Sequence, residues 1–178
     1  MNNMVIKQNN YEKVLKIFFD NPNSRFHIRE IARISGLNPN TIINISKKLL
    51  REELIKREKK KHIVELFANV NEKFKEKKRI NNFKKVIDSR LVDFLKERFN
   101  AEAISMIGSY SRGEDSEESD VDIVVISKQE YETLDLSKFE KILGKEIHLI
   151  ISDYKKMSNE FYINLINGII LYGYITKK

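Results

Sequence analysis

The sequence predicts an α+β protein of two domains: a helical N-terminal domain that ends in a β-hairpin, and a small C-terminal α/β domain with a mixed sheet. Helical spacing of apolar residues dominates the first half, whereas short β-branched runs alternate with helical stretches in the second half. Residues 1–90 carry 22 Lys and Arg against 10 Asp and Glu, whereas residues 91–178 carry 11 against 16. The basic half favours a polyanion as partner, and the acidic half has carboxylates available for a cation.

Composition excludes several classes of site. The 178-residue chain contains no Cys, and its three His residues are far apart, at positions 27, 62 and 148. Disulfides, thiolate metal sites and a zinc site of locally spaced His residues are therefore excluded. The longest apolar stretch, residues 169–175, is much shorter than a bilayer span, and no signal peptide is visible. A soluble, cytoplasmic protein without membrane contact is expected.

Three helices and a hairpin are expected in order along residues 1–70. Asn9 and Asn10 are candidate caps of the first helix, which stops at residues 21–22, where Asn and Pro adjoin. A second, short helix ends at Gly36, where a left-handed turn is needed. Asn38 caps the third helix and Pro39 takes its first position. Two short strands around residues 59–61 then form a basic hairpin.

The third helix is amphipathic. Ile42, Ile45 and Leu49 fall on one face, which leaves a polar and basic face opposite. Asn can pair with adenine edges, and Lys and Arg can reach guanine or phosphate. The residues expected to contact DNA are Asn40, Thr41, Asn44, Lys47, Lys48 and Arg51 on the helix, and Lys59, Lys60 and Lys61 on the hairpin.

The segment FHIREIARISGLNPNTIINISKKLLREELIKRE, within residues 11–68, resembles the winged helix-turn-helix family. The resemblance implies that residues 1–70 bind double-stranded DNA, with the third helix in the major groove and the hairpin as the wing. The alternative is a platform for protein–protein contact or dimerisation, because a fold does not fix a function. Helix-turn-helix proteins often dimerise, so a homodimer is one of the expected states.

A basic connector precedes the second domain. Residues 71–82 are expected to form an exposed helical linker that buries little. Residues 83–178 form the second domain, which opens with an amphipathic helix over residues 83–99. Strands are expected in AEAISMIG, VDIVVIS and EIHLIIS, helices at about residues 136–143 and 153–167, and a last short strand in GIILYGYI.

The segment GSYSRGEDSEESDVDIVV lies between the first two of these strands. Asp120 and Asp122 share one face of an extended strand, so both carboxylates point to one place, where Mg2+ or Mn2+ would relieve their repulsion and bridge triphosphate oxygens. Gly108 lets the backbone approach a phosphate closely, and the Ser109 hydroxyl can donate a hydrogen bond to it. A solvated acidic loop without chemistry is the alternative.

This segment resembles the nucleotidyltransferase superfamily that includes DNA polymerase beta, most closely its minimal, antitoxin-type members. The pattern G-S-x-[AS]-R-G followed by S-D-x-D is matched by Gly108, Ser109, Ser111, Arg112, Gly113, Ser119, Asp120 and Asp122. The resemblance covers residues 83–178 and implies transfer of a nucleoside monophosphate from an NTP, ATP first among them, to a hydroxyl. It implies Asp120 and Asp122 as catalytic metal ligands, with nucleotide contacts from Gly108, Ser109, Ser111 and Arg112.

One position departs from the family pattern. Family members usually carry a third carboxylate on the later strand, and counting from Gly144 places His148 there. Glu146 lies two residues earlier on the same face and is a substitute carboxylate, while His148 is itself a candidate base or ligand. Both are therefore catalytic candidates. A half-buried strand histidine without chemistry is an equally open interpretation of His148.

Together the resemblances imply a nucleotidyltransferase that carries a DNA-binding domain. Minimal family members are often encoded beside a helical protein of the HEPN type, which makes such a protein the expected partner and acceptor of AMP. DNA binding would then regulate transcription of the protein's own operon. The alternative is a catalytically degenerate, nucleotide-sensing transcriptional regulator. Transfer to a small molecule ranks last, because little sequence remains to build an acceptor pocket.

Overall fold

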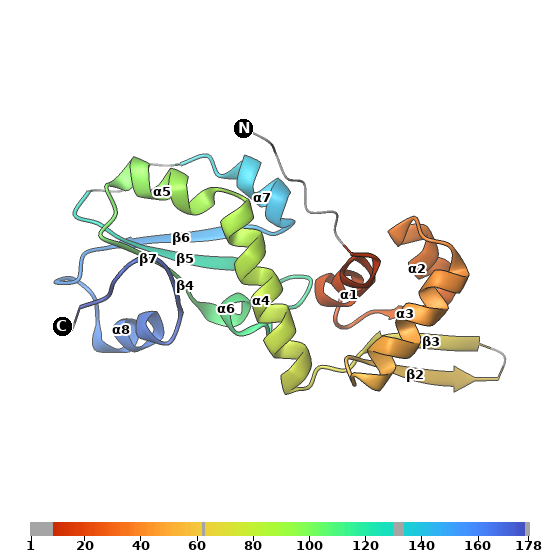
Figure 1. Cartoon of the computed structure of the whole chain (residues 1–178). Helices are drawn as coiled ribbons and strands as arrows, with labels where there is room; N and C mark the ends of the chain where they lie inside the picture. The colour runs from red at the N-terminus through yellow and green to blue at the C-terminus, as the bar shows by residue number, and fades with distance from the viewer. Residues whose placement is uncertain (1–8, 62, 130–133, 177–178) are drawn as a thin grey trace. The chain divides into compact units, whose positions relative to one another are not determined.

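The computed structural model describes residues 9–61, 63–129 and 134–176 (Figure 1). The chain divides into two compact units, residues 1–74 and 75–178. Helices and two sheets together make up the α+β class that the sequence predicts. Within the described ranges, no helix is both long and apolar enough to cross a membrane.

The described part of the first unit contains α1 (Asn10–Asp20), β1 (Arg25–Phe26), α2 (Ile28–Ser35), α3 (Pro39–Arg51), β2 (Ile55–Lys60) and β3 (Ile63–Ala68). The caps form as predicted: Gly36 is left-handed, with φ of 67°, and the Asn38 side chain accepts the Thr41 N–H at 2.9 Å. The strand β1 was not predicted. It pairs antiparallel with β3, so the sheet order is β1-β3-β2.

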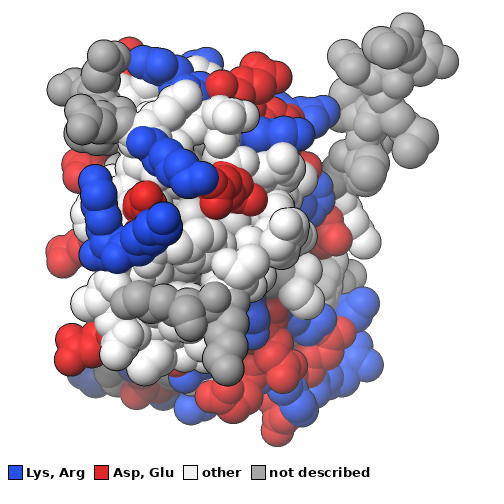
Figure 2. Space-filling view, turned by 90° about the vertical axis from the view of Figure 1, so that its left-hand side faces the viewer, with Lys and Arg blue, Asp and Glu red and all other residues white. Residues whose placement is uncertain are grey.

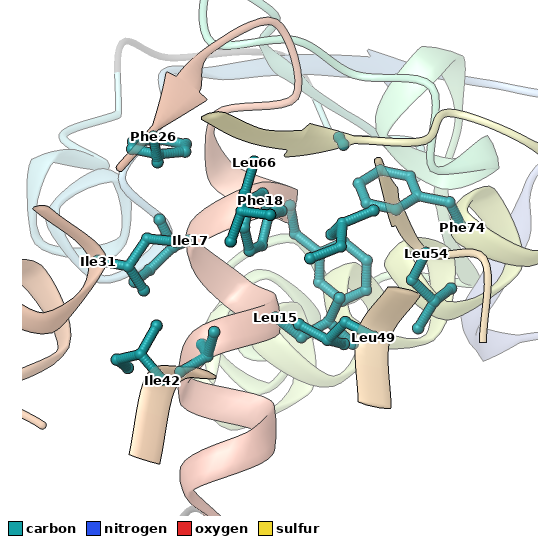
Figure 3. Packing of buried hydrophobic residues seen from close by; sticks show 14 of the residues in the cluster. Leu15, Ile17, Phe18, Phe26, Ile31, Ile42, Leu49, Leu54, Leu66 and Phe74 are labelled. Atoms are coloured by element: carbon teal, nitrogen blue, oxygen red, sulfur yellow. The ribbon is translucent and has the colours of Figure 1, made fainter. Parts of the chain in front are cut away.

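One apolar core joins these helices to the sheet. Phe18 of α1, Ile31 of α2, and Ile42 and Leu49 of α3 are fully buried, and Figure 3 shows them converging around α1. Phe74 packs edge-on against Phe19 of α1, with ring centroids 5.0 Å apart. Each such side chain contributes about 1.5–3 kcal/mol on burial. This core fixes the relative placement of the three helices and the hairpin.

The helix α4 (Glu72–Asp88) starts with the last residues of the first unit and continues in the second. It includes most of the expected linker, and the expected domain start at residue 83 falls inside it. The expectation that residues 71–82 bury little does not hold for one face. Phe74, Lys78 and Asn82, spaced four residues apart, are all buried. Lys78 and Asn82 belong to the second unit, and they are buried because they have polar partners within it, described below.

The amphipathic helix expected over residues 83–99 is two helices, the end of α4 and α5 (Leu91–Phe99). Arg90 adopts a left-handed conformation with φ of 64°, and the Ser89 hydroxyl accepts the N–H of the residue that begins α5. Phe83 and Ile87, whose helical spacing is part of the apolar pattern that predicted one amphipathic helix, are each 38% exposed. The reason is that α4 packs instead through the face that carries Phe74, Lys78 and Asn82.

The second unit continues with β4 (Ala103–Met106), α6 (Gly108–Arg112), β5 (Val121–Ile126), α7 (Ser137–Leu143), β6 (Ile147–Ser152), α8 (Asn159–Ile166) and β7 (Ile169–Gly173). The strand order is β6-β5-β4-β7. Only β5 and β6 are parallel among these pairs, so the sheet is mixed, as predicted. In Figure 1, α5 and α7 cover one face of the sheet and α8 covers the other. The helix α8 is shorter than the expected range of 153–167, because the Ser158 hydroxyl caps it by accepting the Phe161 N–H at 3.2 Å.

The outer surface of α8 carries exposed isoleucines beside polar side chains. Ile163 and Ile166 on this helix and Ile170 on β7 are each about half exposed, and Glu160 is the one charged residue that α8 contributes. Figure 2 views the molecule from the side where α8 lies in Figure 1, and uncharged side chains occupy its middle, with both signs of charge around them. The outward face of α8 therefore carries little charge.

Candidate functional site

The turn between β4 and α6 lies directly beside the start of β5. The Ile107 N–H donates to the backbone carbonyl of Asp122 at 3.0 Å. Gly108 has a φ of 71°, a left-handed conformation that favours glycine. A Cβ at this position would collide with Oδ2 of Asp122. The predicted glycine is therefore needed twice, for its backbone conformation and for the space that the Asp122 carboxylate occupies.

Asp120 and Asp122 flank Val121, whose side chain is fully buried in the core against α5 and α7. Because side chains alternate along a strand, the Asp122 carboxylate belongs to the opposite face, which Val124 and Ile126 share beneath α8. Asp122 is half-buried and Asp120 is exposed. Asp122 thus lies next to the glycine turn at the start of β5, and Asp120 directly precedes this strand.

The parallel neighbour β6 adds two further predicted residues to this edge. Its register places His148 opposite Asp122, and His148 Nδ1 lies 2.9 Å from Asp122 Oδ1. The His148 side chain is 61% exposed and that of Asp122 29%. Glu146 is exposed just before β6, and its backbone carbonyl accepts the Val121 N–H at 2.9 Å. Across the described residues, no three His, Asp or Glu side chains gather closely enough to hold a metal ion.

The other predicted nucleotide contacts differ in environment. Ser109 is half-buried at the start of α6. Ser111 is buried, and its hydroxyl donates to the Gly108 carbonyl at 2.8 Å, so it supports the turn from within. Arg112 is exposed, and its Nε donates to Glu114 at 2.8 Å. Arg112 first, and Lys75 second, hold the pKa of the Glu114 carboxyl below its ordinary value. A phosphate that binds Arg112 must therefore compete with Glu114.

A buried polar cluster supports the segment between the turn and the acids. Asp115 accepts from Asn82 Nδ2 at 2.8 Å and lies 3.2 Å from Lys78 Nζ and 3.8 Å from Lys145 Nζ. The side chains of Lys78 and Asp115 are each only 2% exposed. Sequence reasoning missed all four residues, because polar and charged side chains are expected in solvent when no partner is visible nearby in the sequence. The available signal was the spacing of four residues from Phe74 through Lys78 to Asn82.

The predicted DNA-contacting residues lie in the first unit. Asn40, Asn44, Lys47 and Arg51 are exposed on α3, as is Lys48, whereas Thr41 is half-buried. Lys48 Nζ lies 4.6 Å from the centroid of the Tyr11 ring, so that lysine is partly engaged within the unit. On the hairpin, Lys59 and Lys61 are exposed, and the side chain of Lys60 is outside the described residues. The polar face of α3 and the hairpin thus belong to one small unit.

A hollow between α2 and the hairpin was not predicted. It is lined by His27, Arg29 and Arg33 together with Ile63 and Val64 of β3. Both arginines are exposed, and the His27 ring Nδ1 lies 3.1 Å from the Val64 carbonyl. The arginines add positive charge near the hairpin, although Glu30 also lines the hollow, and their spacing of four residues on α2 was the overlooked signal.

Comparison with known proteins identifies the second unit. The nucleotidyltransferase domain family matches residues 88–172. Three candidate protein adenylyltransferases of Methanocaldococcus jannaschii are similar to this chain. The first is 37% identical over 84 residues, which are 44% of this chain and 82% of the relative. The second and third are 43% and 39% identical over 63 and 64 residues, each 32% of this chain, and 70% and 62% of the relatives. With a relative matched over most of its length and the glycine turn set against the paired acids, this chain belongs to the nucleotidyltransferase family.

Proposed function

We propose that the second unit transfers AMP from ATP to a hydroxyl of a partner protein. The name of the similar archaeal proteins, protein adenylyltransferase, supports this reaction for the present chain. The observation that carries the proposal is the contact between the Gly108 turn and Asp122. It sets the expected phosphate-binding turn against one of the two expected metal ligands, a close contact that a solvated acidic loop would not need.

The donor set of the site fits a divalent cation such as Mg2+ or Mn2+. Asp120 and Asp122 offer carboxylate oxygens, which hard cations prefer, and the side chain of Asp122 keeps Oδ2 beside the turn. These two residues would hold the ion. Bound there, it would neutralise charge on the triphosphate oxygens. The backbone of Gly108 and the hydroxyl of Ser109 would contact those oxygens directly.

In the proposed reaction the acceptor oxygen forms a bond to the α-phosphorus, and the bond from that phosphorus to the bridging oxygen breaks. Pyrophosphate leaves with the electron pair of that bond. The hydroxyl proton passes to His148. With the Nδ1 proton donated to Asp122, the Nε2 of His148 is left as the acceptor for it. Glu146 is the alternative base, because it is exposed two residues earlier at the same edge.

Incubation of the full chain with labelled ATP, Mg2+ and a candidate helical partner protein tests the transfer. We expect label on the partner with the wild type and with Asp93→Asn, an exposed control that carries the same chemical change. Asp120→Asn combined with Asp122→Asn should abolish the label. Equal labelling by that double variant, or none by the wild type with any protein acceptor, would remove the proposal.

A second candidate function is nucleotide sensing without turnover. His148 stands where family members usually carry a carboxylate, and the described residues contain no cluster of three metal-binding side chains. Under this alternative, ATP binds and alters affinity for DNA, but no pyrophosphate is released. Pyrophosphate release with any acceptor decides against it, and a DNA affinity that is independent of ATP decides against the sensing step.

We further propose that the first unit is a winged helix domain that binds double-stranded DNA. The order of α1, α2, α3 and the β2–β3 hairpin supports the proposal, as does the exposed polar face of α3. Asn44→Ala should reduce sequence preference rather than overall affinity, because Asn reads base edges. Regulation of the protein's own operon, a partner of the HEPN type and a homodimer on DNA are parts of the same proposal. An unchanged preference in Asn44→Ala would contradict base reading by α3.

A further inference from the structure

The segment between the turn and the acids needs support that its own composition does not supply. Residues 110–119 contain one large apolar side chain, Tyr110, and otherwise Ser, Gly, Arg, Glu and Asp. Tyr110 is buried, but it lies at the start of the segment. Apolar packing therefore cannot hold the rest of the segment in one conformation, although Asp120 follows it immediately. Its shape has to come from directional polar contacts.

One group of these contacts comes from α4. Asn82 Nδ2 donates to the Tyr110 carbonyl at 3.0 Å and to Asp115 Oδ1 at 2.8 Å. Lys78 Nζ donates to the backbone carbonyl of Asp115 and pairs with its carboxylate. The loop also approaches the helix closely, because a Cβ on Gly113 would come within 2.8 Å of the Arg79 nitrogen. The first half of the segment is thus fixed to α4.

The second half is held by Lys145, which lies between α7 and β6. Its Nζ donates to the carbonyls of Ser116 at 2.5 Å, Ser119 at 3.1 Å and Glu117 at 3.4 Å. The Lys145 side chain is 9% exposed. A buried ammonium surrounded by three carbonyl oxygens and a carboxylate is well satisfied. The ammonium therefore ties the chain just before Asp120 to the residue just before Glu146.

We propose that Lys145 is a positioning residue of the transfer site, and that Lys78 and Asn82 of α4 anchor the segment on which it acts. The inference rests on the proposed transfer function. Lys145 sets the distance between the loop that ends at Asp120 and the segment before β6 that contains Glu146. Lys78 and Asn82 lie outside residues 88–172, so the site depends on a helix that precedes the matched domain.

The test compares three variants of the full chain. Lys145→Met removes the ammonium and keeps the stem, Lys145→Arg keeps a charged multiple donor, and Lys141→Met makes the same charge change at an exposed position of α7. Amide hydrogen exchange of residues 113–120 is measured without nucleotide or metal, and Mn2+ affinity is measured by titration with and without ATP. All measurements are made below the unfolding transition of each variant.

Loss of three carbonyl contacts should raise exchange in residues 116–120 by about tenfold or more in Lys145→Met and weaken Mn2+ binding by roughly fivefold. In the transfer reaction, Lys145→Met should lower kcat by a larger factor than the factor by which it raises the KM for ATP. Lys145→Arg should recover most of each effect, and Lys141→Met should match the wild type. If Lys145→Met does not fold, the test relies on Lys145→Arg. Amide exchange of residues 116–120 in Lys145→Arg should then still be measurably faster than in Lys141→Met.

Unchanged exchange and unchanged Mn2+ affinity in Lys145→Met overturn the proposal, whatever the transfer activity. Faster exchange with unchanged Mn2+ affinity and unchanged kcat also overturns it, because Lys145 would then support the loop without positioning the site. If the wild type never transfers AMP but both binding and exchange respond to Lys145→Met, the transfer function fails while the positioning role for the acids is retained. The two failures are thus distinguishable.

Discussion

Asp115→Asn should strongly destabilise the second unit. The carboxylate is almost completely buried between Lys78 Nζ at 3.2 Å and Lys145 Nζ at 3.8 Å, so its neutral analogue leaves two ammonium groups without their counter-charge. Removing one partner from a buried ion pair costs about 3–5 kcal/mol. Both lysines keep backbone carbonyls as acceptors, which places the expected cost near the lower limit, at about 3 kcal/mol.

This cost is large for a unit of this size. A free energy of unfolding of about 5–15 kcal/mol is usual, and about 1 kcal/mol shifts the midpoint of a domain near 100 residues by roughly 4–8 °C. Asp115→Asn should therefore lower the midpoint of the second unit by more than about 10 °C. The matched control is Asp88→Asn, which breaks the exposed pair between Lys84 and Asp88 on α4. It should cost only about 0.3–0.5 kcal/mol.

Tyrosine fluorescence is a suitable assay, because the chain has no Trp and six of its seven Tyr residues lie in residues 75–178. Thermal and urea transitions followed by this signal therefore report mainly the second unit. Adding Lys78→Met to Asp115→Asn should recover part of the loss, since it removes one unpaired buried charge. The reasoning is refuted if Asp115→Asn unfolds with the wild type, or if the double variant is no more stable than Asp115→Asn alone.

Three further predictions concern single features. Gly108→Ala should weaken Mn2+ and ATP binding by about tenfold, because it adds about 1–2 kcal/mol of left-handed strain and a collision with the neighbouring carboxylate. The control is Gly144→Ala, which has the same φ of 71° but open space around it and should therefore carry only the strain. Replacing Lys59 and Lys61 by Gln should make the dependence of log affinity for duplex DNA on log salt less steep by about 2, and an unchanged slope would remove the hairpin from the interface. Burial first, and then its hydrogen bond to a glutamate, raises the pKa of Tyr11, so its contribution to stability is complete below about pH 10 and is lost as the pH rises through the raised pKa. Urea unfolding from neutral to alkaline pH should show this loss in the wild type but not in Tyr11→Phe, and identical pH profiles would contradict it.

Local rules predicted the part of the site that depends on neighbouring residues. Alternation along a strand predicts that Asp120 and Asp122 share one face around Val121, and the structure buries Val121 in the core and leaves Asp122 half-buried on β5. Gly108 was predicted from the close approach of the backbone to a phosphate, and the structure adds a left-handed conformation at this residue. Capping chemistry likewise predicted where α3 begins, because a cap is satisfied within three or four residues of its own position.

The rest depends on tertiary partners that are distant in the sequence. Lys78 and Asp115 are 37 residues apart, and each is buried only because the other is present. A sequence pattern assigns each of them separately to solvent. The break between α4 and α5 was missed for a related reason: Arg90 takes a left-handed conformation that glycine usually marks, so no residue type announced it. The strand β1 has only two residues, too few for any periodicity.

In the second unit, apolar contacts and polar contacts hold different parts of the chain. Apolar side chains hold the sheet between α5, α7 and α8, and this core sets the register of β5 against β6. The segment before Asp120 has almost no apolar side chain with which to join that core. A buried ion pair adds little net stability compared with apolar packing, because desolvation offsets the attraction. Its donors and acceptors are directional, however, and Lys145 with its carbonyl partners accepts only a narrow set of loop conformations. The conformation of the chain that leads into Asp120 is therefore held by side chains outside the recognisable motif, on α4 and just before β6.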